Sequence, residues 1–126
     1  MITDFESLQS ALPNYIKIAG IEYYLNLIKD YAFISDNKTE INDGEFDINK
    51  GEIRLATTLK DGKTLIDLDR TITVLLHEIL HGIFYHYLED FTENEEHLVT
   101  QLAKGLYQVL KENPELTKLI NKESII

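Results

Sequence analysis

The chain contains no cysteine and no tryptophan, and it has one methionine and two prolines among its 126 residues. Without cysteine there is no disulfide and no thiolate ligand, so any metal site must use histidine and carboxylate side chains. The lack of cysteine suits a reducing compartment, and we expect a cytoplasmic protein. No apolar run reaches the roughly 18 residues that a membrane-spanning helix needs, so we expect no membrane insertion.

Positive charge is also scarce. The chain has 12 Lys and Arg residues against 22 Asp and Glu residues, which gives a formal net charge of -10. Nucleic-acid phosphates and anionic membrane surfaces repel such a chain, so we expect neither as a partner. A basic partner would be attracted, although the charge also serves solubility alone. The length and the apolar content of 44% predict a single domain, residues 1–126, with one core.

The first half of the chain predicts a short helix, two hairpins and the loops between them. The hairpins follow from alternating apolar residues on either side of turn-forming residues. The expected elements are a helix over 4–12, a hairpin over 15–28 that turns at Ala19-Gly20, a loop over 35–44, a hairpin over 45–55 that turns at 49–51, and a turn at 61–63.

The second half predicts helices. The first begins near Thr64 or Asp67, whose spacing resembles a capping box, and runs to about Tyr87. Apolar residues cover nearly all its sides, which predicts a buried central helix in which Gly82 allows another backbone to approach. A second helix should begin at Thr92, with a short third helix over 115–120. Helix, strands and helices in this order predict an α+β fold.

Residues 77–81 read His-Glu-Ile-Leu-His. Histidines four residues apart project from one face of a helix, so both imidazoles can reach one metal ion. Glu78 then points toward the same space, where it can take a proton from a metal-activated water. The alternative is a pair of histidines that bond to the backbone or face solvent. Two imidazoles and a carboxylate in the most apolar helix favour a zinc site with His77 and His81 as ligands.

A catalytic zinc needs a third protein ligand. Carboxylates are the remaining donors, because His86 lies five residues after His81 and is turned off that face. If Thr92 caps the second helix, Glu95 bonds back to the cap and Glu96 is free, with Thr100 and Ala103 as small residues for close packing against the first helix. We therefore expect Glu96 as the metal ligand, with Glu95 as its main rival.

The segments Val-Leu-Leu-His-Glu-Ile-Leu-His-Gly-Ile, at 74–83, and Glu-His-Leu-Val-Thr-Gln-Leu-Ala, at 96–103, together resemble gluzincin-type zinc metallopeptidases. More narrowly, with residues 18–23 and 51–55, they resemble small phage-encoded metallopeptidase-like proteins related to the ImmA/IrrE group. Thr100 stands where gluzincins often carry an aspartate that orients a ligand histidine, so that contact must come from elsewhere.

The resemblance implies a minimal zincin-like domain. A small, mostly antiparallel sheet would pack on the central motif helix, followed by a helix that carries the ligand glutamate. It also implies that an edge strand, expected at 53–56, binds an extended protein or peptide substrate by strand addition. A phage-encoded chain would act in the host cytoplasm.

These features predict a zinc-dependent metallopeptidase of narrow specificity in which Glu78 is the general base. The oxyanion donor is open among Tyr85, His86, His97 and Tyr107. Two other functions stay open: a zinc-binding interaction protein without catalysis, and an acidic interaction protein that mimics nucleic acid. The sequence does not choose the substrate or the oligomeric state.

Overall fold

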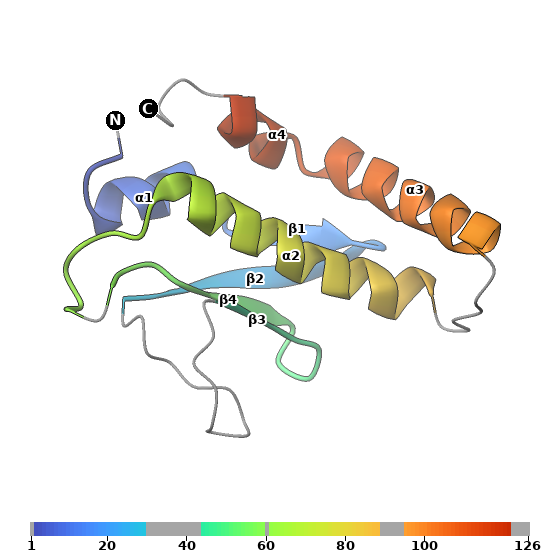
Figure 1. The fold of residues 1–126 in the computed structure, drawn as a ribbon, viewed down its shortest axis with the longest axis horizontal. Helices are drawn as coiled ribbons and strands as arrows, with labels where there is room; N and C mark the ends of the chain where they lie inside the picture. The colour runs from blue at the N-terminus through green and yellow to red at the C-terminus, as the bar shows by residue number, and fades with distance from the viewer. Residues whose placement is uncertain (1, 30–43, 60, 89–94, 122–126) are drawn as a thin grey trace.

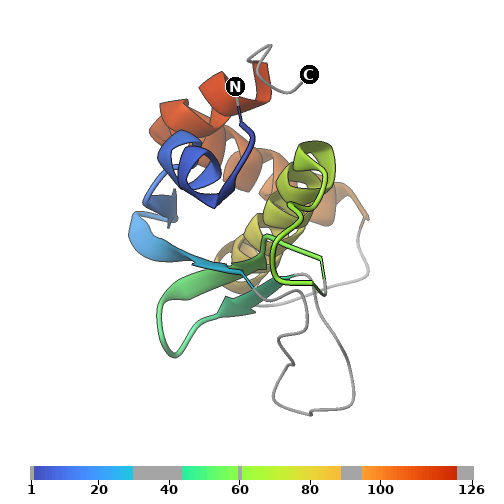
Figure 2. The ribbon, with the colours of Figure 1, turned by 90° about the vertical axis from the view of Figure 1, so that its left-hand side faces the viewer.

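The computed structural model describes residues 2–29, 44–59, 61–88 and 95–121, and of residues 95–97 and 99 it describes only the helical backbone. These residues form an α+β fold with four helices and a mixed four-stranded sheet. Figure 2 shows the sheet as one layer and the helices as a second layer on one of its faces. The predicted loop over 35–44 falls almost entirely outside the described residues.

The N-terminal segment folds as predicted. Helix α1 spans Phe5–Ala11, with Asp4 as its N-cap in a capping box with Ser7. Strands β1 (Tyr15–Ile18) and β2 (Ile21–Ile28) form an antiparallel hairpin. Its two turn residues, Ala19 and Gly20, have φ of 54° and 81°, which matches the left-handed backbone that a tight hairpin turn requires.

The second predicted hairpin is also confirmed, as strands β3 (Gly44–Asp47) and β4 (Glu52–Ala56). The sheet order is β1-β2-β4-β3, with β2 and β4 parallel and the other pairs antiparallel. The expectation of an edge strand at 53–56 is therefore wrong. Strand β4 pairs on both sides, in keeping with buried Ile53, Leu55 and Ala56, and β3 is the edge of the described sheet.

Helix α2 (Leu68–Tyr87) crosses the sheet (Figure 1). It begins after Asp67, whose side chain caps nothing, and Thr64 instead donates to Asp61 at 2.6 Å. The predicted capping box at Thr64 is therefore wrong. The helix is also not buried on all sides. One stripe faces the core, whereas Phe84 and Tyr85 are exposed, because a two-layer fold covers only one side of the helix.

Helix α3 (Glu95–Glu112) runs beside α2, and α4 (Pro114–Asn121) follows after Asn113, as predicted. The predicted cap at Thr92 lies outside the described residues. The close contact between α2 and α3 is at Gly105, where an added Cβ would lie 2.5 Å from Ile83 Cγ2. Thr100 and Ala103 are exposed, so the expectation that these two small residues make the contact is wrong.

One core cluster joins the sheet to the helices. At Gly82, an added Cβ would lie 2.6 Å from Ile18 Cδ1 and 3.1 Å from Phe46 Cε1. The glycine thus makes room for side chains of the sheet and not, as predicted, for another backbone. Among the described residues, no helix is long and apolar enough to cross a membrane.

Candidate metal centre

Helix α2 places the two motif histidines side by side on its exposed face. The Nε2 atoms of His77 and His81 lie 3.2 Å apart, and their rings meet edge to face at a centroid distance of 4.8 Å. The spacing of four residues produces this arrangement, because such positions lie one above the other on a helix. Both imidazoles therefore offer a ring nitrogen to the same point in space.

This spacing fits a shared metal ion. Two imidazole nitrogens at about 2.0–2.1 Å from a tetrahedral zinc lie about 3.3–3.4 Å apart, close to the observed 3.2 Å. The same distance also suits a direct N–H···N hydrogen bond between the two rings. The case for a metal therefore also depends on the other potential ligands near the pair. Burial, followed by the charge of His77, lowers the pKa of His81 below its usual range, which favours the neutral form that binds metals.

Glu78 turns from the same helix toward strand β3 and is buried, with 6% of its surface exposed. Burial raises the pKa of its carboxyl group; the neighbouring His77 opposes this effect, and Glu45 adds to it. Gly44 makes the position possible, since a Cβ there would lie 3.3 Å from Glu78 Cγ and 2.7 Å from Val74 Cγ1. A carboxylate in this setting is suited to accept and release a proton.

A cleft of about 420 Å³ joins the motif to the edge strand. One wall comes from α2 and the other from β3 with the turn after it. Its lining residues are His77, Glu78, His81, Tyr85, Gly44, Glu45, Phe46 and Ile48. The contribution of the β3 wall was not predicted. The hairpin pattern placed these residues in a strand, but nothing local indicates which strand lies beside the motif helix.

Arg54 of β4 offsets part of the negative charge beside the β3 wall. Its guanidinium donates to Glu45, to Glu52 at 2.6 Å and to Asp47 at 3.1 Å. Burial disfavours the charged guanidinium, but the hydrogen bonds that it donates to these carboxylates outweigh that cost and raise the pKa of Arg54. Glu45 is therefore held in place at the rim of the cleft.

The expected third ligand lies outside what the structure describes. Glu96 is in the first turn of α3, and its side chain is not described; within the described residues no group of three metal-binding side chains is gathered. Its rival, Glu95, is the first residue of α3, and its side chain is not described either.

The three described candidates for the oxyanion donor lie in different parts of the fold. Tyr85 lines the cleft, is 54% exposed, and is one turn from His81. His86 contacts the buried hydroxyl of Tyr23 inside the fold. Tyr107 is 66% exposed on α3, where Lys111 lies over its ring, and the side chain of His97 is not described. Tyr85 is thus the described candidate that shares a cleft with the motif.

Comparison of the chain with protein families, with curated proteins and with solved structures found no match in any of the three.

Proposed function

We propose that this protein is a zinc-dependent metallopeptidase with a zincin-like arrangement and narrow specificity. The observation that carries the proposal is the pair of His77 and His81 ring nitrogens 3.2 Å apart, in one cleft with the buried carboxylate of Glu78. Two imidazoles that converge beside a carboxylate of raised pKa are the parts that metal-assisted hydrolysis needs. The arrangement rests on local helix geometry, which the sequence motif independently predicts.

In this proposal His77 and His81 hold the metal, together with a carboxylate from the first turn of α3. The sequence favours Glu96, with Glu95 as its main rival. Zinc, when bound, lowers the pKa of a coordinated water and polarises the carbonyl of the scissile peptide.

Side chains that line the cleft transfer the proton and stabilise the developing negative charge. Glu78 takes the proton from the attacking water and delivers it to the leaving amine. Tyr85 donates its hydroxyl hydrogen to the oxygen on which charge develops. An extended substrate pairs with β3, the edge strand that forms the opposite wall of the cleft.

Elemental analysis of the tag-free protein tests the metal centre. We expect about one zinc per chain in the wild type and a loss in the His77→Ala variant. Glu95→Gln and Glu96→Gln, compared side by side, identify the third ligand, since only the true ligand weakens zinc binding when it changes. Folded wild-type protein that takes up no zinc when zinc is offered would refute the proposal and favour an acidic interaction protein.

Catalysis is tested separately by Glu78→Gln. This variant removes the proton acceptor but leaves both histidines, so we expect zinc content to stay and peptide hydrolysis to stop. Full activity in Glu78→Gln would refute the mechanism. Zinc content without turnover of peptide pools by the wild type would favour the second function, a zinc-binding interaction protein.

A further inference from the structure

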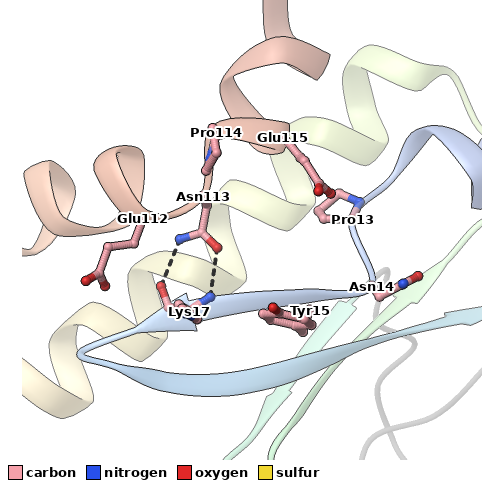
Figure 3. Close-up of a pocket in the computed structure, with 8 residues that line it drawn as sticks. All are labelled: Pro13, Asn14, Tyr15, Lys17, Glu112, Asn113, Pro114 and Glu115. Atoms are coloured by element: carbon pink, nitrogen blue, oxygen red, sulfur yellow. Dashed lines mark hydrogen bonds between the residues drawn. The ribbon is translucent and has the colours of Figure 1, made fainter.

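At one edge of the described sheet, the outward backbone groups are hydrogen-bonded to side chains from a remote part of the chain. At edge strand β1, the backbone of Lys17 faces away from β2, toward the junction of α3 and α4. Its N–H donates to Asn113 Oδ1 at 2.8 Å, and its carbonyl oxygen accepts from Asn113 Nδ2 at 2.9 Å (Figure 3). One side-chain amide thus presents the donor and acceptor that a neighbouring strand would present.

Gln108 extends this pattern by one step along the edge. Its Oε1 accepts from Ala19 N–H at 2.9 Å, and its Nε2 donates to the Lys17 carbonyl oxygen at 3.1 Å. Two consecutive outward positions of the edge are therefore bonded to amide side chains of α3 and the residue after it. We call Asn113 and Gln108 the amide seal.

The surroundings of the seal also oppose strand pairing. Pro13, which has no N–H, precedes β1, and Pro114 follows Asn113; both line a cleft of about 230 Å³ beside the seal (Figure 3). Lys17 adds a charge to the middle of the strand. Proline and lysine are residues with which natural sheets protect their edges.

Strand β3 lies at the other edge of the described sheet. There the backbone N–H of Phe46 is hydrogen-bonded to the Glu78 carboxylate, so a side chain occupies a backbone donor of this strand as well. An edge strand with unpaired backbone groups is a template for an added strand.

We propose that the amide seal closes the β1 edge of the sheet to strand addition. When the seal is removed, the partner at β1 is a second copy of this chain. Two antiparallel β1 edges can pair around a two-fold axis, which gives a closed, self-complementary contact. This inference concerns the sheet and does not depend on whether a metal binds.

The test compares Gln108→Ala, Asn113→Ala and the double variant with a matched control, Gln101→Ala. Gln101 lies on the same helix but donates to the Tyr87 carbonyl oxygen, away from β1. Light scattering coupled to size exclusion, over a range of concentrations, should show self-association at least about tenfold tighter than in the wild type for the seal variants. Gln101→Ala should match the wild type.

A cysteine cross-link distinguishes β1 pairing from general aggregation. Because the natural chain has no cysteine, Tyr15→Cys places a single thiol on exposed β1, and Thr100→Cys places one on exposed α3 as a control. In the seal variants, oxidation should link chains through position 15 and not through position 100. Cross-linking at both positions to the same extent would overturn the proposal.

Asn113 is buried, so its replacement can impair folding; Gln108 is half-buried and its variant serves as the second test. If circular dichroism shows that Asn113→Ala is unfolded, the result for Gln108→Ala alone decides whether the proposal holds. Folded seal variants that remain as monomeric as the wild type would overturn the proposal. Dimers linked through position 15 would support it.

Discussion

The Nε2 atoms of His77 and His81 are 3.2 Å apart, with Glu78 buried between them and the edge strand β3. Helix geometry sets this spacing. In the folded chain, strand β3 lies on one side of the pair and solvent on the other. The pair is therefore accessible to an ion and close to a proton acceptor.

Zinc should stabilise the protein through this pair. A ligand that binds only the folded state raises the free energy of unfolding by about 2.7 kcal/mol at a hundredfold excess over Kd. We expect zinc to raise the Tm of the wild type and to have no such effect on His77→Ala or His81→Ala. Tyr85→Phe, which keeps both ligands, is the control and should retain the shift. An unchanged zinc response in both histidine variants would contradict the assignment.

Tyr85 should contribute to binding at the zinc-loaded cleft, and Tyr107 should not. A hydrogen bond to a charged group is worth about 1.5–3 kcal/mol, or roughly 10- to 100-fold in affinity. We expect Tyr85→Phe to weaken the binding of acetohydroxamate by at least about tenfold, measured by calorimetry, with zinc content unchanged. Tyr107→Phe removes a hydroxyl from a tyrosine that is 66% exposed on α3 and should bind as the wild type does. Equal affinities in both variants would exclude Tyr85 as the donor.

Gly105→Ala should destabilise the contact between α2 and α3. The added Cβ would lie 2.5 Å from Ile83 Cγ2 and 3.3 Å from Tyr87 Cδ2. Overpacking costs about 1–3 kcal/mol and opposes a gain of about 1 kcal/mol in helix propensity. We expect a lower midpoint in urea, whereas Thr100→Ala at an exposed site of the same helix should be neutral or slightly stabilising. A Gly105→Ala midpoint at or above the wild-type value would show that the helices separate at little cost.

Asp61 should make stability depend on pH in acid. Hydrogen bonds from Thr64, through its hydroxyl and its N–H, and from the N–H of Lys63 lower the pKa of Asp61 to about 2. The unfolded chain has the higher pKa, so it takes up the proton first as the pH falls. The stabilisation is complete above the unfolded pKa, near 4, and is lost as the pH falls toward about 2.

The measurement for Asp61 is urea unfolding of the wild type and Asp61→Asn at a series of pH values. The stability difference between the two should shrink as the pH falls from about 5 to about 2. A difference that stays constant over this range would mean that the carboxylate charge does not stabilise the turn.

Local sequence patterns were sufficient to predict several elements of the structure. Alternation around Ala19-Gly20 and around residues 49–51 predicted both hairpins, because a hairpin is made by residues near one another in the chain. The pairing of His77 with His81 was predictable for the same reason, since helix geometry alone sets it.

Contacts between distant segments were not predictable. The family resemblance implied an edge strand at 53–56, but the parallel pairing of β2 with β4 puts that segment inside the described sheet and makes β3 the edge. The sequence also assigned the contact between helices to Thr100 and Ala103, whereas the fold uses Gly105. Such choices depend on which surfaces fit together across the core, and no periodicity within one segment records that.

The sequence by itself therefore determined the chemistry that α2 can offer: two imidazoles and a carboxylate within residues 77–81 of one helix, in a chain without cysteine. Only the tertiary structure decided that β3 forms the other wall of the cleft, that Tyr85 lies in it while His86 turns to Tyr23, and that amide side chains close the β1 edge. The reason is physical: helix and turn geometry is fixed by neighbouring residues, whereas clefts and sheet edges arise where segments remote in sequence pack together.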